Sequence, residues 1–124
     1  MNHKALQELM EKKNIDIIFL ANIRHKDPHL YYLTHMESEY LFLTIEQNKD
    51  PTLYASSLEF EKTKHDSIIK NVKLLNKNPF ELLNNLIKKS KARTIGINQN
   101  ILTINEYNTL IKKNKKVKII DINK

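Results

Sequence analysis

The amino-acid sequence predicts an α/β fold in which a mixed six-stranded sheet is flanked by helices. The apolar run IIFL at residues 17–20 does not alternate, so it suits a central strand that is covered on both faces. The short connection between the apolar segments 40–45 and 53–55 is typical of an antiparallel hairpin. After residue 56 strand and helix patterns alternate, which predicts parallel strands joined by right-handed crossovers.

The first third of the chain is expected to form a helix and the central strand. Residues 4–13 place apolar side chains on one helical face, and Asn14 suits the left-handed residue that ends such a helix. Residues 15–21 then form the central strand. Residues 22–39 are predicted to be a polar loop, because Pro28 blocks regular pairing.

The middle of the chain is expected to add the hairpin and one further strand. We predict strands at residues 40–45 and 53–55, with a turn at 48–51 between them. A weak helix at residues 57–65 precedes a fourth strand at 72–75.

Two capping patterns mark the helices of the last third. Asn78 before Pro79, with Glu81 following, predicts a capping box, and a second one is predicted at Thr103 and Glu106. The first helix buries Leu82, Leu83, Leu86 and Ile87, and the second turns Tyr107, Leu110 and Ile111 inward. The fifth and sixth strands are expected at residues 94–97 and 117–122. Gly96, the only glycine, predicts close packing within the fifth strand.

Composition limits the function classes. The 124 residues suit a single domain, residues 1–124, and they contain no cysteine, which removes disulfides, thiol catalysis and cysteine-ligated zinc. One glycine cannot build a phosphate-binding loop. The net charge is +7, but lysines spread over several helix ends, with only two arginines, do not favour a nucleic-acid partner. We expect no signal peptide, no membrane span and a cytoplasmic location.

The candidate functional residues lie in the predicted loop, which is rich in histidine, tyrosine and acidic side chains. Its polar candidates are Arg24, His25, Asp27, His29, His35, Glu37 and Glu39. Three interpretations of this segment remain: a solvated loop, a metal site, or a loop that contacts a substrate or partner. The hypothesis of a metal site is weakened because no histidine pair in this segment has the spacing of a helical zinc motif.

Other candidate groups have weaker support for a functional role. Tyr31 and Tyr32 are adjacent, so we expect one to anchor the loop in the core while the other faces solvent or a ligand. Asp16 and Asp121 lie on strands and could belong to a two-metal nuclease, but further acids would have to converge on them. Ser56, Ser57 and His65 lack a nucleophile motif. The lysine-rich segment 112–118 is interpreted as a solvated helix end.

Several phrases in a fixed order resemble the N-terminal domain of the creatinase, prolidase and aminopeptidase P metallopeptidases. They are LQELMEKKNIDIIFLA, DPHLYYLTH, YLFLTI, SLEFEKTKHD and TIGINQNILTINEYNTL, which together cover essentially the whole chain. In DPHLYYLTH the matching positions are Asp27, Pro28, Tyr32, Leu33 and Thr34. His35 stands where the family pattern has glycine, and we expect it to change the local turn.

The resemblance implies a ribonuclease H-like, mixed six-stranded domain without catalytic or metal-binding residues of its own. It implies a C-terminal catalytic domain in the same polypeptide, holding two divalent metal ions (manganese, cobalt or zinc). It also implies a homodimer and a peptide substrate. The chain is then an accessory domain of a metal-dependent Xaa-Pro peptidase, supporting dimerisation and walling the substrate cleft. The loop residues Arg24, His25, Asp27, His29, Tyr31, Tyr32 and His35 are its candidate contacts. The alternative is a free-standing basic module that binds an acidic partner or nucleic acid.

Overall fold

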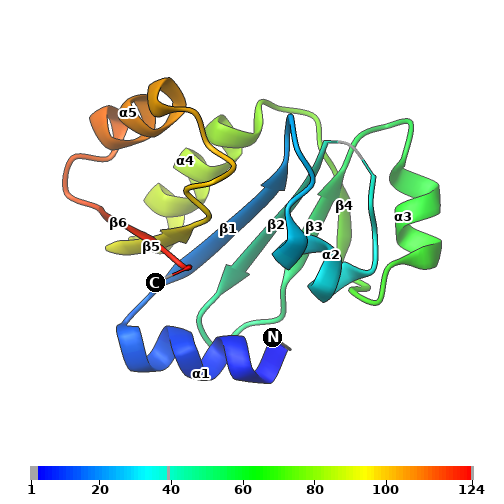
Figure 1. Ribbon diagram of the computed structural model, residues 1–124, viewed down its shortest axis with the longest axis horizontal. Coiled ribbons are helices and arrows are strands. Elements are labelled where there is room, and N and C mark those ends of the chain that lie inside the picture. Colours follow the sequence, from blue (N-terminus) through cyan, green and yellow to red (C-terminus); the bar gives the residue numbers. More distant parts are fainter. Residues whose placement is uncertain (1–2, 39, 124) are drawn as a thin grey trace.

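The computed structural model describes residues 3–38 and 40–123, which form one mixed sheet with helices on both faces (Figure 1). The helices are α1 His3–Lys13, α2 Pro28–Thr34, α3 Phe60–Asp66, α4 Pro79–Ser90 and α5 Ile104–Lys113. The strands are β1 Ile17–Asn22, β2 Leu41–Glu46, β3 Thr52–Ala55, β4 Val72–Leu74, β5 Thr94–Ile97 and β6 Lys118–Asp121. The predicted α/β class and the six strands are confirmed.

The sheet runs in the order β4-β3-β2-β1-β5-β6. The antiparallel pair β2–β3 is the predicted hairpin, and β1–β2 is also antiparallel. The pairs β3–β4, β1–β5 and β5–β6 are parallel. All six residues of β1 are buried, because β1 lies between β2 and β5 and has helices above and below it. A non-alternating apolar strand is the sequence that such a position needs.

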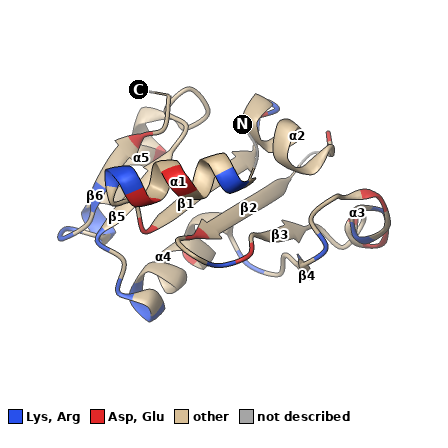
Figure 2. Ribbon diagram, turned by 90° about the horizontal axis from the view of Figure 1, so that it is seen from below, with Lys and Arg blue, Asp and Glu red and all other residues tan. Residues whose placement is uncertain are grey.

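Two apolar cores lie on opposite faces of the sheet. The first packs Leu6 and Met10 of α1 and Leu30 of α2 against β1, β2 and β3. The second packs Leu83 and Ile87 of α4 with Leu110 of α5 against the other face. Seen along the sheet, α1 and α2 lie on one side and α4 on the other, while α3 stands beside β3 and β4 (Figure 2).

Local signals set most of the element boundaries. Asn14 ends α1 with φ 56°, and Lys91 ends α4 with φ 58°. Thr103 and Glu106 form the predicted capping box at the start of α5. Gly96 is as tightly packed as expected, since a Cβ atom there would lie 2.8 Å from Ile122 Cγ2.

Three predictions about the boundaries, caps and packing of the helices are wrong. Residues 22–39 are not a loop throughout, because α2 occupies Pro28–Thr34. At α4 the Asn78 side chain accepts a hydrogen bond from Phe80 N–H and not from Glu81 N–H, so the cap is a single side-chain bond. Ile111 does not face inward but is 39% exposed, because α5 covers the sheet with the side of the helix that carries Leu110.

Candidate functional site

The candidate residues cluster around α2, and this helix begins with a well-defined cap. Asp27 Oδ1 accepts a hydrogen bond from His29 N–H (2.9 Å), and Pro28 occupies the first helical turn, where its missing N–H costs nothing. The Asp27 N–H in turn donates to Asn22 Oδ1 (2.6 Å) at the end of β1. Asp27 is completely buried, so among the candidates it builds the helix start and does not present a charge to solvent.

Both tyrosines of α2 lie on its outer face. Tyr31 is 48% exposed and Tyr32 56% exposed, whereas Leu30 and Leu33 are buried against the sheet. The prediction that one tyrosine anchors the segment in the core is therefore wrong. Successive residues of a helix are only about 100° apart, so two neighbours can share the outward-facing half, and the leucines on either side supply the anchor.

His35 ends α2 in the left-handed conformation, with φ 60° and ψ 26°. Its N–H donates to Tyr31 O (2.7 Å), which satisfies a carbonyl of the last helical turn. Its ring lies 6.1 Å from the Tyr31 ring, measured between centroids. The expectation that a histidine changes this turn is wrong, because His35 adopts the backbone angles that a glycine takes most easily.

Arg24 connects the segment before α2 with α5 on the other face of the sheet. Its Nη1 donates to Glu106 Oε2 (3.0 Å), and its Nη2 donates to Ile101 O (2.9 Å). Burial alone would raise the pKa of Glu106. The hydrogen bond from Arg24 and the bonds from Thr103 outweigh burial, so the pKa of this carboxyl lies below its usual 4.5. Arg24 therefore fixes the loop to α5.

The histidines of this region do not form a common centre. His25 is exposed, and His29 Nε2 lies 2.8 Å from Asn123 Oδ1. In the two described ranges, no group of three or more His, Cys, Asp or Glu side chains could hold a metal ion. Glu37 is exposed, and Glu39 lies outside the described residues.

The two carboxylates predicted on strands, Asp16 and Asp121, accept hydrogen bonds from backbone N–H groups. Asp16 Oδ2 accepts from the N–H groups of Arg93 and Thr94, at the start of β5. Asp121 Oδ1 accepts from the N–H of Gln99 (3.3 Å) and from Asn123. These hydrogen bonds give both acids a role in the fold, and they tie the start and the end of β5 to their neighbours.

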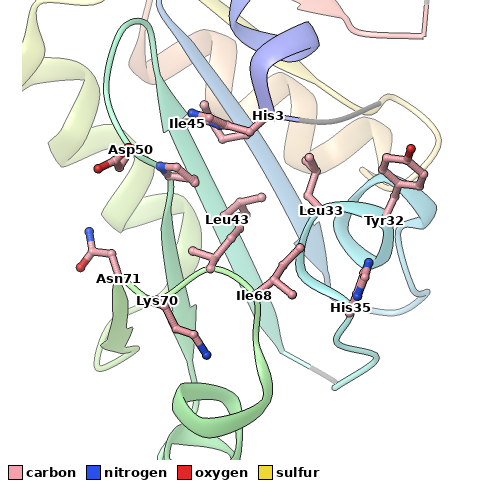
Figure 3. A pocket seen from close by; sticks show the side chains of 12 residues that line it. His3, Tyr32, Leu33, His35, Leu43, Ile45, Asp50, Ile68, Lys70 and Asn71 are labelled. Carbon is pink, nitrogen blue, oxygen red and sulfur yellow. The ribbon is translucent and has the colours of Figure 1, made fainter.

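The main concavity beside α2 is a groove of about 650 Å³ between α1, α2 and the segment that leads into β4 (Figure 3). We call it the α2 groove. Its apolar lining comes from Leu33, Leu43, Ile45, Pro51, Ile68 and Ile69, and its polar lining from His3, Tyr32, His35, Asp50, Lys70 and Asn71. Of the sequence-predicted candidates, the groove brings together Tyr32 and His35 only.

The remaining polar groups of the α2 groove were missed by sequence reasoning. His3, Asp50, Lys70 and Asn71 come from three separate segments, and no local spacing relates them. A second hollow of about 800 Å³ lies on the opposite face between α4 and α5. Its rim includes Tyr40, which has φ 54°. None of the described helices is long and apolar enough to cross a membrane.

Comparison with known proteins gives one family and many similar structures. The model of the family described as Creatinase/Prolidase N-terminal domain matches residues 3–124. A search of curated proteins finds no significant match.

Three solved structures illustrate the likeness. The X-Pro aminopeptidase from Thermotoga maritima superposes with a TM-score of 0.80 at 16% identity, over 98% of this chain and 34% of that one. A proline dipeptidase from Streptococcus pneumoniae superposes with a TM-score of 0.75 at 17% identity, over 98% of this chain and 92% of that one. The N-terminal domain of the cytoplasmic peptidase PepQ from Mycobacterium tuberculosis superposes with a TM-score of 0.74 at 11% identity, over 94% of this chain and 88% of that one. Identities this low establish the fold, and the chain spans about a third of the Thermotoga enzyme.

Proposed function

Because the chain belongs to the family of the creatinase/prolidase N-terminal domain, we propose that it is the non-catalytic accessory domain of a metal-dependent Xaa-Pro peptidase. The parent enzyme would be of the proline dipeptidase or aminopeptidase P type. A C-terminal domain of the same polypeptide would hold the two divalent metal ions and carry out the hydrolysis. The residues 1–124 would form one domain that supports dimerisation and walls the substrate cleft.

The observation that carries this proposal is the match of the family model over residues 3–124, which is essentially the whole chain. The side chains present do not fit a dinuclear metal centre, since His25, His29 and the nearby acids do not converge within the described residues. No step of the hydrolysis is therefore assigned to them. The cytoplasmic location stays part of the proposal, and its support is the similar domain of the cytoplasmic peptidase PepQ.

The structure divides the seven candidate contacts into two groups. Asp27, Arg24 and His29 are engaged within the fold, as a helix cap, as a link to α5 and as a partner of Asn123. The remaining four candidates, His25, Tyr31, Tyr32 and His35, are exposed, and within the described residues their side chains have no such role in the fold. Large half-exposed aromatic side chains are typical of contact surfaces, so we assign contacts with substrate or the second subunit to the exposed group.

Two measurements test the proposal. The chain alone, supplied with manganese or cobalt, should not hydrolyse Xaa-Pro peptides, and sustained turnover would refute the accessory role. In the full-length enzyme, replacing Tyr31 and Tyr32 together with alanine should raise KM or weaken the dimer. Ile104→Ala, which truncates an exposed apolar residue of α5, is the matched control. Unchanged kinetics and mass in the double variant would remove the contact role.

A second function has one specific observation in its favour. The segments 88–93 and 112–118 are joined where Lys118 N–H donates to Arg93 O (2.8 Å). Nine exposed basic residues gather there: Lys88, Lys89, Lys91, Arg93, Lys112, Lys113, Lys115, Lys116 and Lys118. Figure 2 shows this basic end near β5 and β6. The lysines are thus not spread as widely as the sequence suggested, and an acidic partner could dock there. Salt-sensitive binding of an acidic peptide or of nucleic acid would favour this reading.

A further inference from the structure

The α2 groove has the build of a ligand site, and nothing so far assigns a ligand to it. Its floor is formed by Leu43 and Ile45 of β2, which pack into the core beneath, and its walls include Leu33 and Ile69. Ile68, at its edge, is 56% exposed. A concavity of this volume with an apolar floor and a few polar groups matches the usual form of a small-ligand pocket.

One polar atom in the lining lacks a partner. His3 Nδ1 is buried and makes no hydrogen bond within residues 3–38 and 40–123. The His3 ring lies beside Ile45 at one edge of the groove (Figure 3). A buried nitrogen without a partner is costly. Because this atom is shielded from the groove, we assign it no contact with a ligand.

The polar and charged groups of the α2 groove lie apart from one another. Asp50 lies on one side of the groove and His35 on the opposite side, and Lys70 adds an ammonium group on the segment before β4 (Figure 3). Neither Asp50 nor Lys70 forms an ion pair with any described residue. A carboxylate and an ammonium that flank an apolar floor are complementary to a zwitterion with an apolar body.

We propose that the α2 groove binds short peptides that have a free amino terminus and an apolar side chain. The amino terminus lies at Asp50, the apolar side chain contacts Leu33, Ile68 and Ile69 above the buried floor, and the carboxylate lies toward Lys70 and His35. The choice of a peptide among zwitterionic ligands rests on the proposed function. The groove is then a peptide-binding site without hydrolytic chemistry of its own.

An NMR titration of the 124-residue chain tests this site. The probes are the tripeptide alanyl-leucyl-alanine, its N-acetylated form and its C-terminal amide. The unmodified peptide should shift the amide signals of residues 32–35, 43–45 and 68–71. Loss of the amino charge by acetylation should weaken binding about tenfold, as expected for one charge-assisted hydrogen bond. The amide should bind more weakly than the acid for the same reason.

Variants identify the contacts. Asp50→Asn should weaken the unmodified peptide about tenfold and leave the acetylated peptide unaffected. Ile68→Ala should weaken all three peptides. Glu61→Gln, which neutralises an exposed carboxylate on α3, is the matched control and should change nothing.

Three results would overturn the proposal. They are no shift up to about 10 mM peptide, equal binding of the free and acetylated peptides by the unmodified chain, or shifts confined to the second hollow between α4 and α5. The comparison of free and acetylated peptides needs no variant, so it holds even if Asp50→Asn does not fold. A negative titration rejects the groove alone, because the accessory role is tested separately in the full-length enzyme.

Discussion

Replacing His35 with glycine tests the most unusual backbone position of the candidate site. His35 holds φ 60° and ψ 26° at the end of α2, and its N–H is bonded to Tyr31 O. A residue with a Cβ atom pays about 1–2 kcal/mol in the left-handed region. Glycine avoids this cost but loses about 0.5–1 kcal/mol of additional chain entropy on folding.

The left-handed backbone cost and the chain entropy of glycine together predict the order of stability of the position-35 variants. His35→Ala keeps the left-handed cost and loses the ring contact with Tyr31, so it should be slightly less stable than the parent. His35→Gly should be more stable than His35→Ala by about 1 kcal/mol, and within about 1 kcal/mol of the parent. The free energy of unfolding, measured by urea denaturation with circular dichroism, gives both differences.

A matched pair controls for the general effect of glycine. Asn85 is exposed in the interior of α4, where ordinary helical angles favour alanine over glycine by about 1 kcal/mol. The order of the alanine and glycine variants should therefore reverse between positions 35 and 85. If His35→Gly is no more stable than His35→Ala, the left-handed turn does not carry the strain that we attribute to it.

Three other substitutions have defined outcomes. Gly96→Ala places a Cβ atom 2.8 Å from Ile122 Cγ2 and should cost about 1–3 kcal/mol of unfolding free energy, with a smaller cost in an Ile122→Ala background. Asn78→Ala removes the α4 cap and should cost about 1 kcal/mol, whereas Asn85→Ala should not destabilise. The folded pKa of Glu106 lies below 4.5, so its stabilising effect is present above the unfolded pKa and is lost as pH falls through the folded pKa. The stability difference between the parent and Glu106→Gln should therefore shrink below about pH 4.5, as acid titrations of both proteins would show, and a constant difference would contradict the Arg24–Glu106 pairing.

Local sequence signals predicted the scaffold well, because each depends on a few neighbouring residues. The run at 17–20 has no polar face, and only a doubly covered strand accommodates it. Thr103 and Glu106 satisfy each other's backbone groups within one turn, so their spacing alone locates the start of α5.

The same kind of signal is present at α2, where we predict a loop and the structure has a helix. Asp27-Pro28 has the same cap and first-turn chemistry as Asn78-Pro79. At Pro28 our loop prediction rests instead on the missing N–H, which prevents strand pairing. A helix of only 7 residues shows little apolar periodicity, which is why the cap was its main local sign. Reading that cap would also have identified His35 as the left-handed residue that ends the helix.

By itself, the sequence determined the α/β class, the six strands, most caps and the family to which the chain belongs, since these depend on periodicity and short spacing. Tertiary structure alone decided which polar groups meet. In the folded chain Arg24 is bonded to Glu106 of α5, and Asp27 is buried. His3, Asp50 and Lys70 line one groove together with Tyr32 and His35. Residues 3, 50 and 70 are far apart along the chain. The packing of α1 over β2 and the pairing of β3 with β4 bring them around one groove.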